Sequence, residues 1–119
     1  MAHILVVEDD STLARLIQDI LEEEGYTVTV VTRSMQALDT LRVIQPDLIL
    51  LDVLLDALTG IDLCEAITGH PATAHIPIIL CSAVAKSWVP VTCPYRAFLA
   101  KPFAVQRLLE VVAIHVRRA

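Results

Sequence analysis

Ile4-Leu5-Val6-Val7-Glu8-Asp9-Asp10 is a short apolar run that ends in three consecutive acids, and three later apolar runs of the chain also end at a polar residue. These other run ends are Asp52 after Leu48–Leu51, Ser82 after Ile76–Cys81, and Lys101 after Phe98–Ala100. In an open parallel sheet, the carboxyl ends of all strands lie on the same side. The four run ends therefore predict one site that combines carboxylates, a hydroxyl and an ammonium group.

Short apolar runs alternate with amphipathic segments along the chain, which is typical of a parallel α/β domain. We expect strands over residues 3–7, 26–31, 47–51, 76–81 and 98–100, the second being a half-exposed edge strand. We expect helices from Ser11 to about Glu24, from Ser34 to about Gln45, over residues 61–68 and over residues 104–116. Ser11 and Ser34 are the predicted N-caps, and Gly25 is the predicted residue just past the first helix. Asp10 is expected only to cap the first helix with its negative charge. The fold prediction is a doubly wound, five-stranded parallel sheet.

The segment over residues 85–95 does not follow this alternation. Pro90 and Pro94 interrupt it, and Val89, Val91 and Thr92 are poor helix formers. We therefore expect a short or irregular fourth helix.

Composition excludes several classes of protein. The 119 residues carry a net charge of −5 with a pI near 5.2, which disfavours direct nucleic-acid binding. No uncharged apolar stretch approaches the roughly 18 residues that a membrane span needs. Cys64, Cys81 and Cys93 lack metal-ligand spacing and are expected to be free thiols. The expected location is cytoplasmic.

The residue types at the four run ends suit one chemistry. Clustered carboxylates suit a hard divalent cation such as Mg²⁺, while a hydroxyl and an ammonium group suit phosphoryl oxygens. A carboxylate is a poor nucleophile toward a charged phosphoryl group unless a cation offsets the repulsion, so the acids near Asp52 favour aspartyl-phosphate chemistry.

In four motifs, the chain resembles the receiver domain of two-component response regulators, of the chemotaxis-receiver type. The motifs are Ile4–Asp10, Leu50-Leu51-Asp52, Ser82-Ala83 and Lys101-Pro102-Phe103. The resemblance covers the whole chain, so residues 1–119 are expected to form one receiver domain. It implies a flavodoxin-like fold with strand order 2-1-3-4-5.

The resemblance also implies a role for each site residue. Asp52 is the implied phospho-acceptor, assisted by Ser82 and Lys101, and a cis peptide bond before Pro102 aims Lys101 inward. Ser82 and Phe98 are the implied switch residues. The implied Mg²⁺ ligands are Asp9 and Asp52 directly, Glu8 through water, and the backbone carbonyl of Leu54.

The chain departs from the family pattern at three places. Ser82 and Lys101 are only 19 positions apart, nearly one helical turn fewer than usual, which again places the fourth helix in doubt. Asp56 stands where the family usually has proline, and Thr59 stands where an acid commonly precedes the glycine.

The expected function is a signalling switch that receives a phosphoryl group on Asp52 from a sensor histidine kinase or phosphotransfer protein. It would then change its affinity for an unidentified output partner, and a homodimer is compatible with this. Such a domain catalyses only its own phosphorylation and dephosphorylation. No membrane association is expected.

Two alternatives belong to other classes. A haloacid-dehalogenase-like phosphohydrolase also uses an aspartyl phosphate, but it needs a second Asp two positions after the first, where this chain has Leu54. A receiver-like interaction domain that is never phosphorylated is the third reading.

Overall fold

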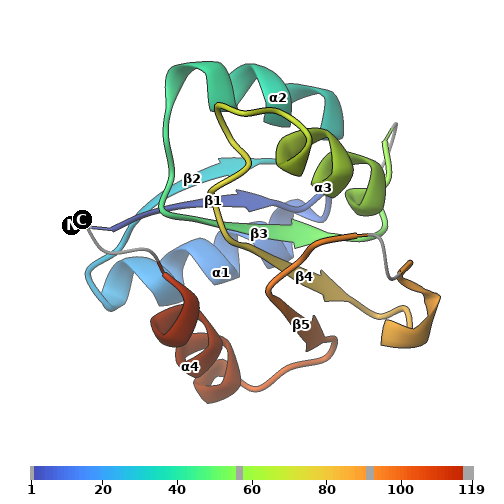
Figure 1. Cartoon of the computed structure of the whole chain (residues 1–119). Coiled ribbons are helices and arrows are strands. Elements are labelled where there is room, and N and C mark those ends of the chain that lie inside the picture. The colour runs from blue at the N-terminus through green and yellow to red at the C-terminus, as the bar shows by residue number, and fades with distance from the viewer. Residues whose placement is uncertain (1, 56–57, 91–92, 117–119) are drawn as a thin grey trace.

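The computed structural model describes residues 2–55, 58–90 and 93–116, and its centre is a five-stranded parallel sheet (Figure 1). The strands are β1 His3–Val7, β2 Thr27–Val31, β3 Leu48–Asp52, β4 Ile78–Ser82 and β5 Ala97–Ala100. Their order is β2-β1-β3-β4-β5, which confirms the predicted topology. The α-helices are α1 Ser11–Glu23, α2 Ser34–Val43, α3 Gly60–Thr68 and α4 Val105–His115.

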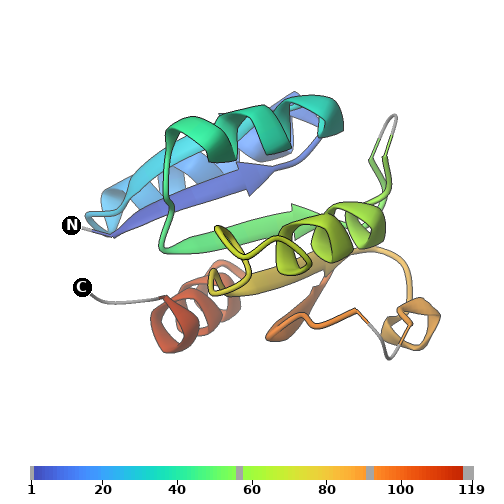
Figure 2. The same cartoon turned by 45° about the horizontal axis from the view of Figure 1, so that its top comes forward.

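Helices cover both faces of the sheet: α2 and α3 lie on one side, and α1 and α4 lie on the other (Figure 1). Side chains alternate between the two faces along each strand. Leu5 and Val7 of β1 pack beneath α2 and α3, whereas Ile4 and Val6 pack on the α1 and α4 side. All five residues of β3 are buried. The strands point the same way (Figure 2), so their carboxyl ends share one edge of the molecule.

The predicted N-caps Ser11 and Ser34 are wrong, whereas the predicted capping role of Asp10 is confirmed. Asp10 is the N-cap of α1, where its carboxylate accepts hydrogen bonds from the amides of Thr12 and Leu13. Ser11 is the first helical residue instead, because the longer Asp10 side chain reaches both amides. Ser34 is the first residue of α2, and its buried hydroxyl oxygen accepts a hydrogen bond from the Leu58 amide in the loop after β3.

Other predicted boundaries hold to within one or two residues. Gly25, just past α1, has φ of 93° and confirms the predicted position of a left-handed residue. β3 and β4 each extend one residue further than expected, so Asp52 and Ser82 are the last residues of their strands. α2 ends at Val43, before the extended residue Ile44.

The segment between β4 and β5 contains no α-helix within its described residues, as predicted. Its only helical feature there is a single 3₁₀ turn over Lys86–Trp88. Val89 and Cys93 are nevertheless buried in the core beneath α3. Residues 91–92 lie outside the described residues. Across the described chain, no helix is long and apolar enough to span a membrane.

Gly60 fixes how α3 follows β3. Its amide donates a hydrogen bond to the Val53 carbonyl over 2.8 Å, which brings the start of α3 against the end of β3. A Cβ at Gly60 would lie 1.9 Å from the carbonyl oxygen of Asp52 and 2.8 Å from Cα of Val53. Both are backbone atoms of buried residues, so only glycine fits.

Gly60→Ala should therefore destabilise the fold by roughly 1 to 3 kcal/mol, because the methyl group forces the backbone apart at Asp52. Urea denaturation followed by circular dichroism measures this free energy of unfolding. Gly69→Ala is the matched control, since its Cβ would come no nearer than 3.0 Å to the Glu65 carbonyl oxygen and 4.0 Å to that of Ala66. Equal destabilisation by the two substitutions would contradict the close-approach argument.

Candidate functional site

Three carboxylates gather at the carboxyl ends of the two central strands. Glu8 and Asp9 follow β1, and Asp52 ends β3, whose residue Leu51 pairs with Val7. One carboxylate oxygen from each of the three acids lies within 4.8 Å of the others. Glu8 and Asp52 are only 2% and 6% exposed, whereas Asp9 is exposed. Among the described residues, this is the one cluster of acidic, histidine or cysteine side chains that could hold a metal ion.

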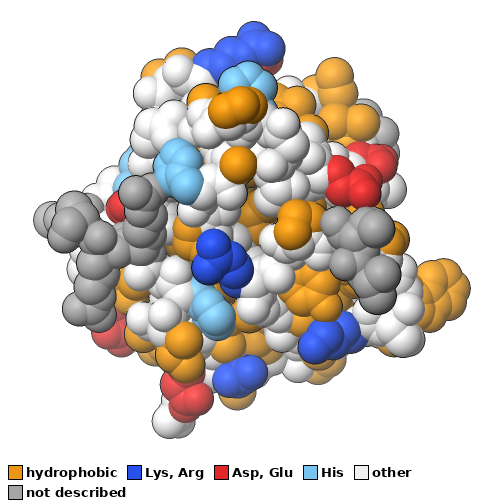
Figure 3. All heavy atoms as spheres, viewed as in Figure 1, with side chains coloured by type: hydrophobic (Ala, Val, Ile, Leu, Met, Phe, Trp, Pro, Cys, Tyr) orange, Lys and Arg blue, Asp and Glu red, His pale blue; other side chains and the backbone are white. Residues whose placement is uncertain are grey.

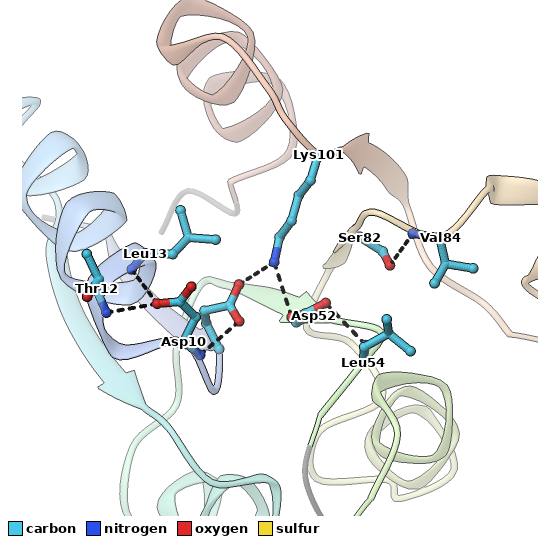
Figure 4. Close-up of polar contacts among 9 residues, drawn as sticks. Asp10, Thr12, Leu13, Asp52, Leu54, Ser82, Val84 and Lys101 are labelled. Atoms are coloured by element: carbon cyan, nitrogen blue, oxygen red, sulfur yellow. Dashed lines mark hydrogen bonds and ion pairs between the residues drawn. The ribbon is translucent and has the colours of Figure 1, made fainter.

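Lys101, the residue that follows β5, extends its side chain to this cluster (Figure 4). Its ammonium group donates to Oε1 of Glu8 over 2.5 Å and to Oδ2 of Asp52 over 3.1 Å. The peptide bond between Lys101 and Pro102 is cis, as predicted, and the Lys101 amide donates to the carbonyl oxygen of Ser82. Lys101 is thus held by its backbone at β4 while its side chain reaches the acids.

The second oxygen of each buried carboxylate is bound by a backbone amide. Oε2 of Glu8 accepts from the Asp10 amide, and Oδ1 of Asp52 accepts from the Leu54 amide, both over 3.2 Å. These bonds fix the orientation of the two carboxylates. Within the described residues, no buried side-chain oxygen or nitrogen lacks a hydrogen-bond partner.

The electrostatics of the cluster favour a further cation. Burial raises the pKa of Glu8, the neighbouring Asp52 raises it further, and the hydrogen bond from Lys101 only partly offsets these effects. Burial by itself would lower the pKa of Lys101, but its contacts with Glu8 and Asp52 outweigh this and raise the pKa above its ordinary value. Lys101 therefore stays charged, and one ammonium group faces several carboxylates.

Ser82 and Leu54 flank the carboxylate of Asp52 (Figure 4). Ser82 ends β4, one residue beyond Cys81, which pairs with Asp52, and it is 1% exposed. Its hydroxyl oxygen accepts a hydrogen bond from the Val84 amide over 2.9 Å, so the O–H group is still able to donate. The Leu54 side chain is 55% exposed and offers no polar atom to the site.

Phe98 is not part of the acidic cluster. It lies on β5, half-buried on the α3 side of the sheet, where its ring meets the ring of Tyr95 edge-on at a centroid distance of 6.3 Å. Tyr95 as its partner was not predicted from the sequence.

Three contributions of the backbone were also missed. The amides of Asp10 and Leu54 orient the buried carboxylates, and Gly60 allows α3 to approach Asp52. Backbone groups carry no residue signature, so only the glycine could have been found in advance. Thr59, which departs from the family pattern, caps α3 by accepting from the Asp62 amide. Asp56, the other departure in this loop, lies outside the described residues.

Comparison with known proteins agrees with this geometry. The family model of the response regulator receiver domain matches residues 4–113, and the chain belongs to this family. It is 34% identical over 120 residues to the DNA-binding response regulator MtrA of Mycolicibacterium paratuberculosis, covering 98% of this chain and 52% of that protein. It is also 34% identical over 122 residues to the phosphate regulon transcriptional regulatory protein PhoB of Rhizobium meliloti, covering 100% of this chain and 54% of that protein. The chain thus spans about half the length of these relatives.

Solved structures share the fold over nearly the whole chain. The receiver domain of a signal transduction histidine kinase from Syntrophus aciditrophicus has a TM-score of 0.90 and 32% identity, covering 96% of this chain and 89% of that one. The receiver domain of the sensor histidine kinase PA1611 from Pseudomonas aeruginosa, with a magnesium ion coordinated in its active-site cleft, has a TM-score of 0.88 and 28% identity, covering 96% of each chain. This protein is therefore a receiver domain of two-component signalling.

Proposed function

We propose that Asp52 accepts a phosphoryl group from a phosphohistidine of a sensor histidine kinase or phosphotransfer protein, and that phosphorylation changes the affinity for an output partner. The observation that carries the proposal is the position of Asp52. Its carboxylate is buried at the end of the central strand, contacts Lys101, and is grouped with Glu8 and Asp9. The proposed nucleophile, an ammonium group and the two proposed metal-binding acids are thus close together.

The proposed reaction is a displacement at phosphorus. An oxygen of Asp52 forms a bond to phosphorus while the bond from phosphorus to the histidine nitrogen breaks, and the histidine keeps the electron pair and takes up a proton. Lys101 already binds Oδ2 of Asp52 and would bind an oxygen of the transferred group, stabilising its charge. The Leu54 amide holds Oδ1 and so limits rotation of the carboxylate.

Mg²⁺ is the cofactor that we propose for this site. Asp9 and Asp52 would bind it directly, Glu8 through water, and Leu54 through its backbone carbonyl. The donor set fits a hard divalent cation, because three carboxylates are close together. Burial, and then the neighbouring Asp52, raise the pKa of Glu8, so a bound cation would stabilise its ionised form. The bound ion would neutralise negative charge on the phosphoryl oxygens.

Ser82 and Phe98 are the proposed switch residues. The Ser82 hydroxyl is able to donate to a phosphoryl oxygen on Asp52, which would move the end of β4 toward the phosphate. The Phe98 ring is half-buried against the core and meets the ring of Tyr95, and in this proposal it changes rotamer when β4 moves. Phosphate would act as the ligand that favours one of two arrangements.

The remaining parts of the proposal concern the setting of the domain. We take residues 1–119 as one cytoplasmic receiver domain that catalyses only its own phosphorylation and dephosphorylation, and a homodimer is compatible with this. We propose no direct nucleic-acid binding by this domain, because the net charge is −5 and Lys and Arg are scattered on the face drawn in Figure 3. The DNA-binding role in the names of relatives such as MtrA belongs to proteins of about twice this length.

The phosphohydrolase alternative is disfavoured because the side chain of Leu54 cannot act as a general acid or base.

Acetyl phosphate with Mg²⁺ should add the mass of one phosphoryl group to the protein, and Asp52→Asn should abolish the addition because the amide is not nucleophilic. Intact-protein mass spectrometry measures the gain. Asp62→Asn, an equal change at an exposed acid of α3, is the control and should be labelled normally. Labelling of Asp52→Asn at the unmodified rate would contradict the assignment, and no labelling of the unmodified protein would favour the interaction-domain alternative.

Mg²⁺ binding should distinguish two adjacent acids of equal charge. Asp9→Ala should remove most of the heat of Mg²⁺ binding in calorimetry, because it removes a direct ligand. Asp10→Ala should keep that heat but lower the free energy of unfolding by about 1 kcal/mol, because Asp10 caps α1. Equal loss of Mg²⁺ binding in both variants would show that Asp9 acts only through its negative charge and is not a direct ligand.

A further inference from the structure

The two edge strands of the sheet, β2 and β5, differ in how their outer edges are protected (Figure 1). Proteins block exposed strand edges with charges, prolines or bulges, because an open edge can pair with another chain. β5 is flanked by prolines and cations, namely Pro94, Arg96, Lys101 and Pro102. Residues 26–32, Tyr-Thr-Val-Thr-Val-Val-Thr, contain no charge, proline or glycine, and β2 pairs with β1 residue by residue without a bulge. Among the described residues, no strand pairs with the outer edge of β2.

The backbone of β2 turns alternate residues toward this open edge. The Thr27 amide donates to the Ala2 carbonyl over 2.9 Å, and the Val31 carbonyl accepts from the Glu8 amide over 3.0 Å. Residues 27, 29 and 31 therefore direct their amides and carbonyls toward β1, since both groups of an extended residue point the same way. Val28 and Val30 direct theirs away from β1. Each of these two valines thus presents one donor and one acceptor to a further strand.

α2 leaves this edge of the sheet uncovered. A hollow of about 500 Å³ lies between β2 and α2, lined by Thr29 and Val31 of the strand and by Thr40 and Val43 of the helix. Val43 is apolar and yet 85% exposed. The hollow leaves room on this face of the sheet for the side chains of an added strand.

Opposite charges mark the two ends of β2. Glu24 follows α1 just before the strand, Arg33 precedes α2 just after it, and both side chains are exposed. A second β2 strand that lies antiparallel about Thr29 would place its Glu24 beside Arg33 and its Arg33 beside Glu24. The same strand in parallel register would place acid beside acid and base beside base. Charge complementarity therefore favours an antiparallel copy of the same strand.

We propose that β2 is a self-association surface, where β2 of a second copy of this chain pairs in antiparallel orientation and joins the two sheets into one. A two-fold axis through Thr29 sets Val28 of each copy opposite Val30 of the other, and each such pair exchanges both of its backbone hydrogen bonds. Thr29 lies opposite Thr29 of the second copy. This pairing needs no phosphoryl group on Asp52.

The first test measures the mass of the unphosphorylated protein by sedimentation over a range of concentrations, because one strand pair buries little area and gives a dimer in equilibrium with monomer. Glu24→Arg and Arg33→Glu should each raise the dissociation constant about tenfold, since attractive pairs become repulsive. An equimolar mixture of the two variants should associate as the unmodified protein does, because opposite charges meet again. Both substitutions place favourable charges at helix ends, so the fold should be retained.

A second test fixes the register. In Thr29→Cys, the two introduced thiols lie opposite each other at the two-fold axis, where the Cα atoms of such a pair are about 4.5 Å apart, so mild oxidation should link two chains. Thr27→Cys is the matched control and should not link, since its thiol lies opposite Val31 of the second copy. The unmodified protein, whose own cysteines are buried, should not link either. Circular dichroism confirms that each variant is folded.

Four results would overturn the proposal. A monomeric mass at every concentration is one, and it is also the result expected if the edge takes a strand of a different protein. The others are no link in Thr29→Cys, equal linking of Thr27→Cys, and a mixture of the charge variants that associates no better than either variant alone. None of these results bears on phosphorylation of Asp52, which the mass-gain experiment tests separately.

Discussion

The ammonium group of Lys101 bridges two buried carboxylates, and the arrangement of the site depends on this contact. Glu8 and Asp52 are buried close together, and two ionised carboxylates in such a position repel each other and lose hydration. Lys101 donates to both, and backbone amides bind their remaining oxygens. The acids can therefore remain close and buried, in a position where a cation or a phosphoryl group would find partners.

The parallel sheet makes this contact between distant parts of the sequence. Glu8 follows β1, Asp52 ends β3, and Lys101 follows β5, so each strand delivers one member to the same edge. Two local features complete the geometry: the cis peptide bond between Lys101 and Pro102, and the close approach of Gly60 to Asp52.

Most of the fold could be predicted from the sequence because buried parallel strands are continuous apolar runs and each ends at a chemically distinct residue. The meeting of Glu8, Asp9, Asp52 and Lys101 followed from topology alone, while their roles in catalysis stay predictions. The cap at Ser11 was wrong because the neighbouring Asp10 accepts the amides of the first turn. The cap at Ser34 was wrong because its hydroxyl binds the Leu58 amide of a distant loop. The orienting amides of Asp10 and Leu54 and the ring contact of Tyr95 depend on tertiary packing, which no residue pattern encodes.

The most direct test of the Lys101 contact is a double-mutant cycle on the free energy of unfolding, measured by urea denaturation without Mg²⁺. Lys101→Met should destabilise the protein by about 3 kcal/mol or more, because it leaves buried carboxylates without their cation. In a Glu8→Gln background, the same substitution should cost clearly less, because fewer charges remain to be neutralised. A cost of only about 0.5 kcal/mol for Lys101→Met, equal in both backgrounds, would contradict the view that this contact holds the site together.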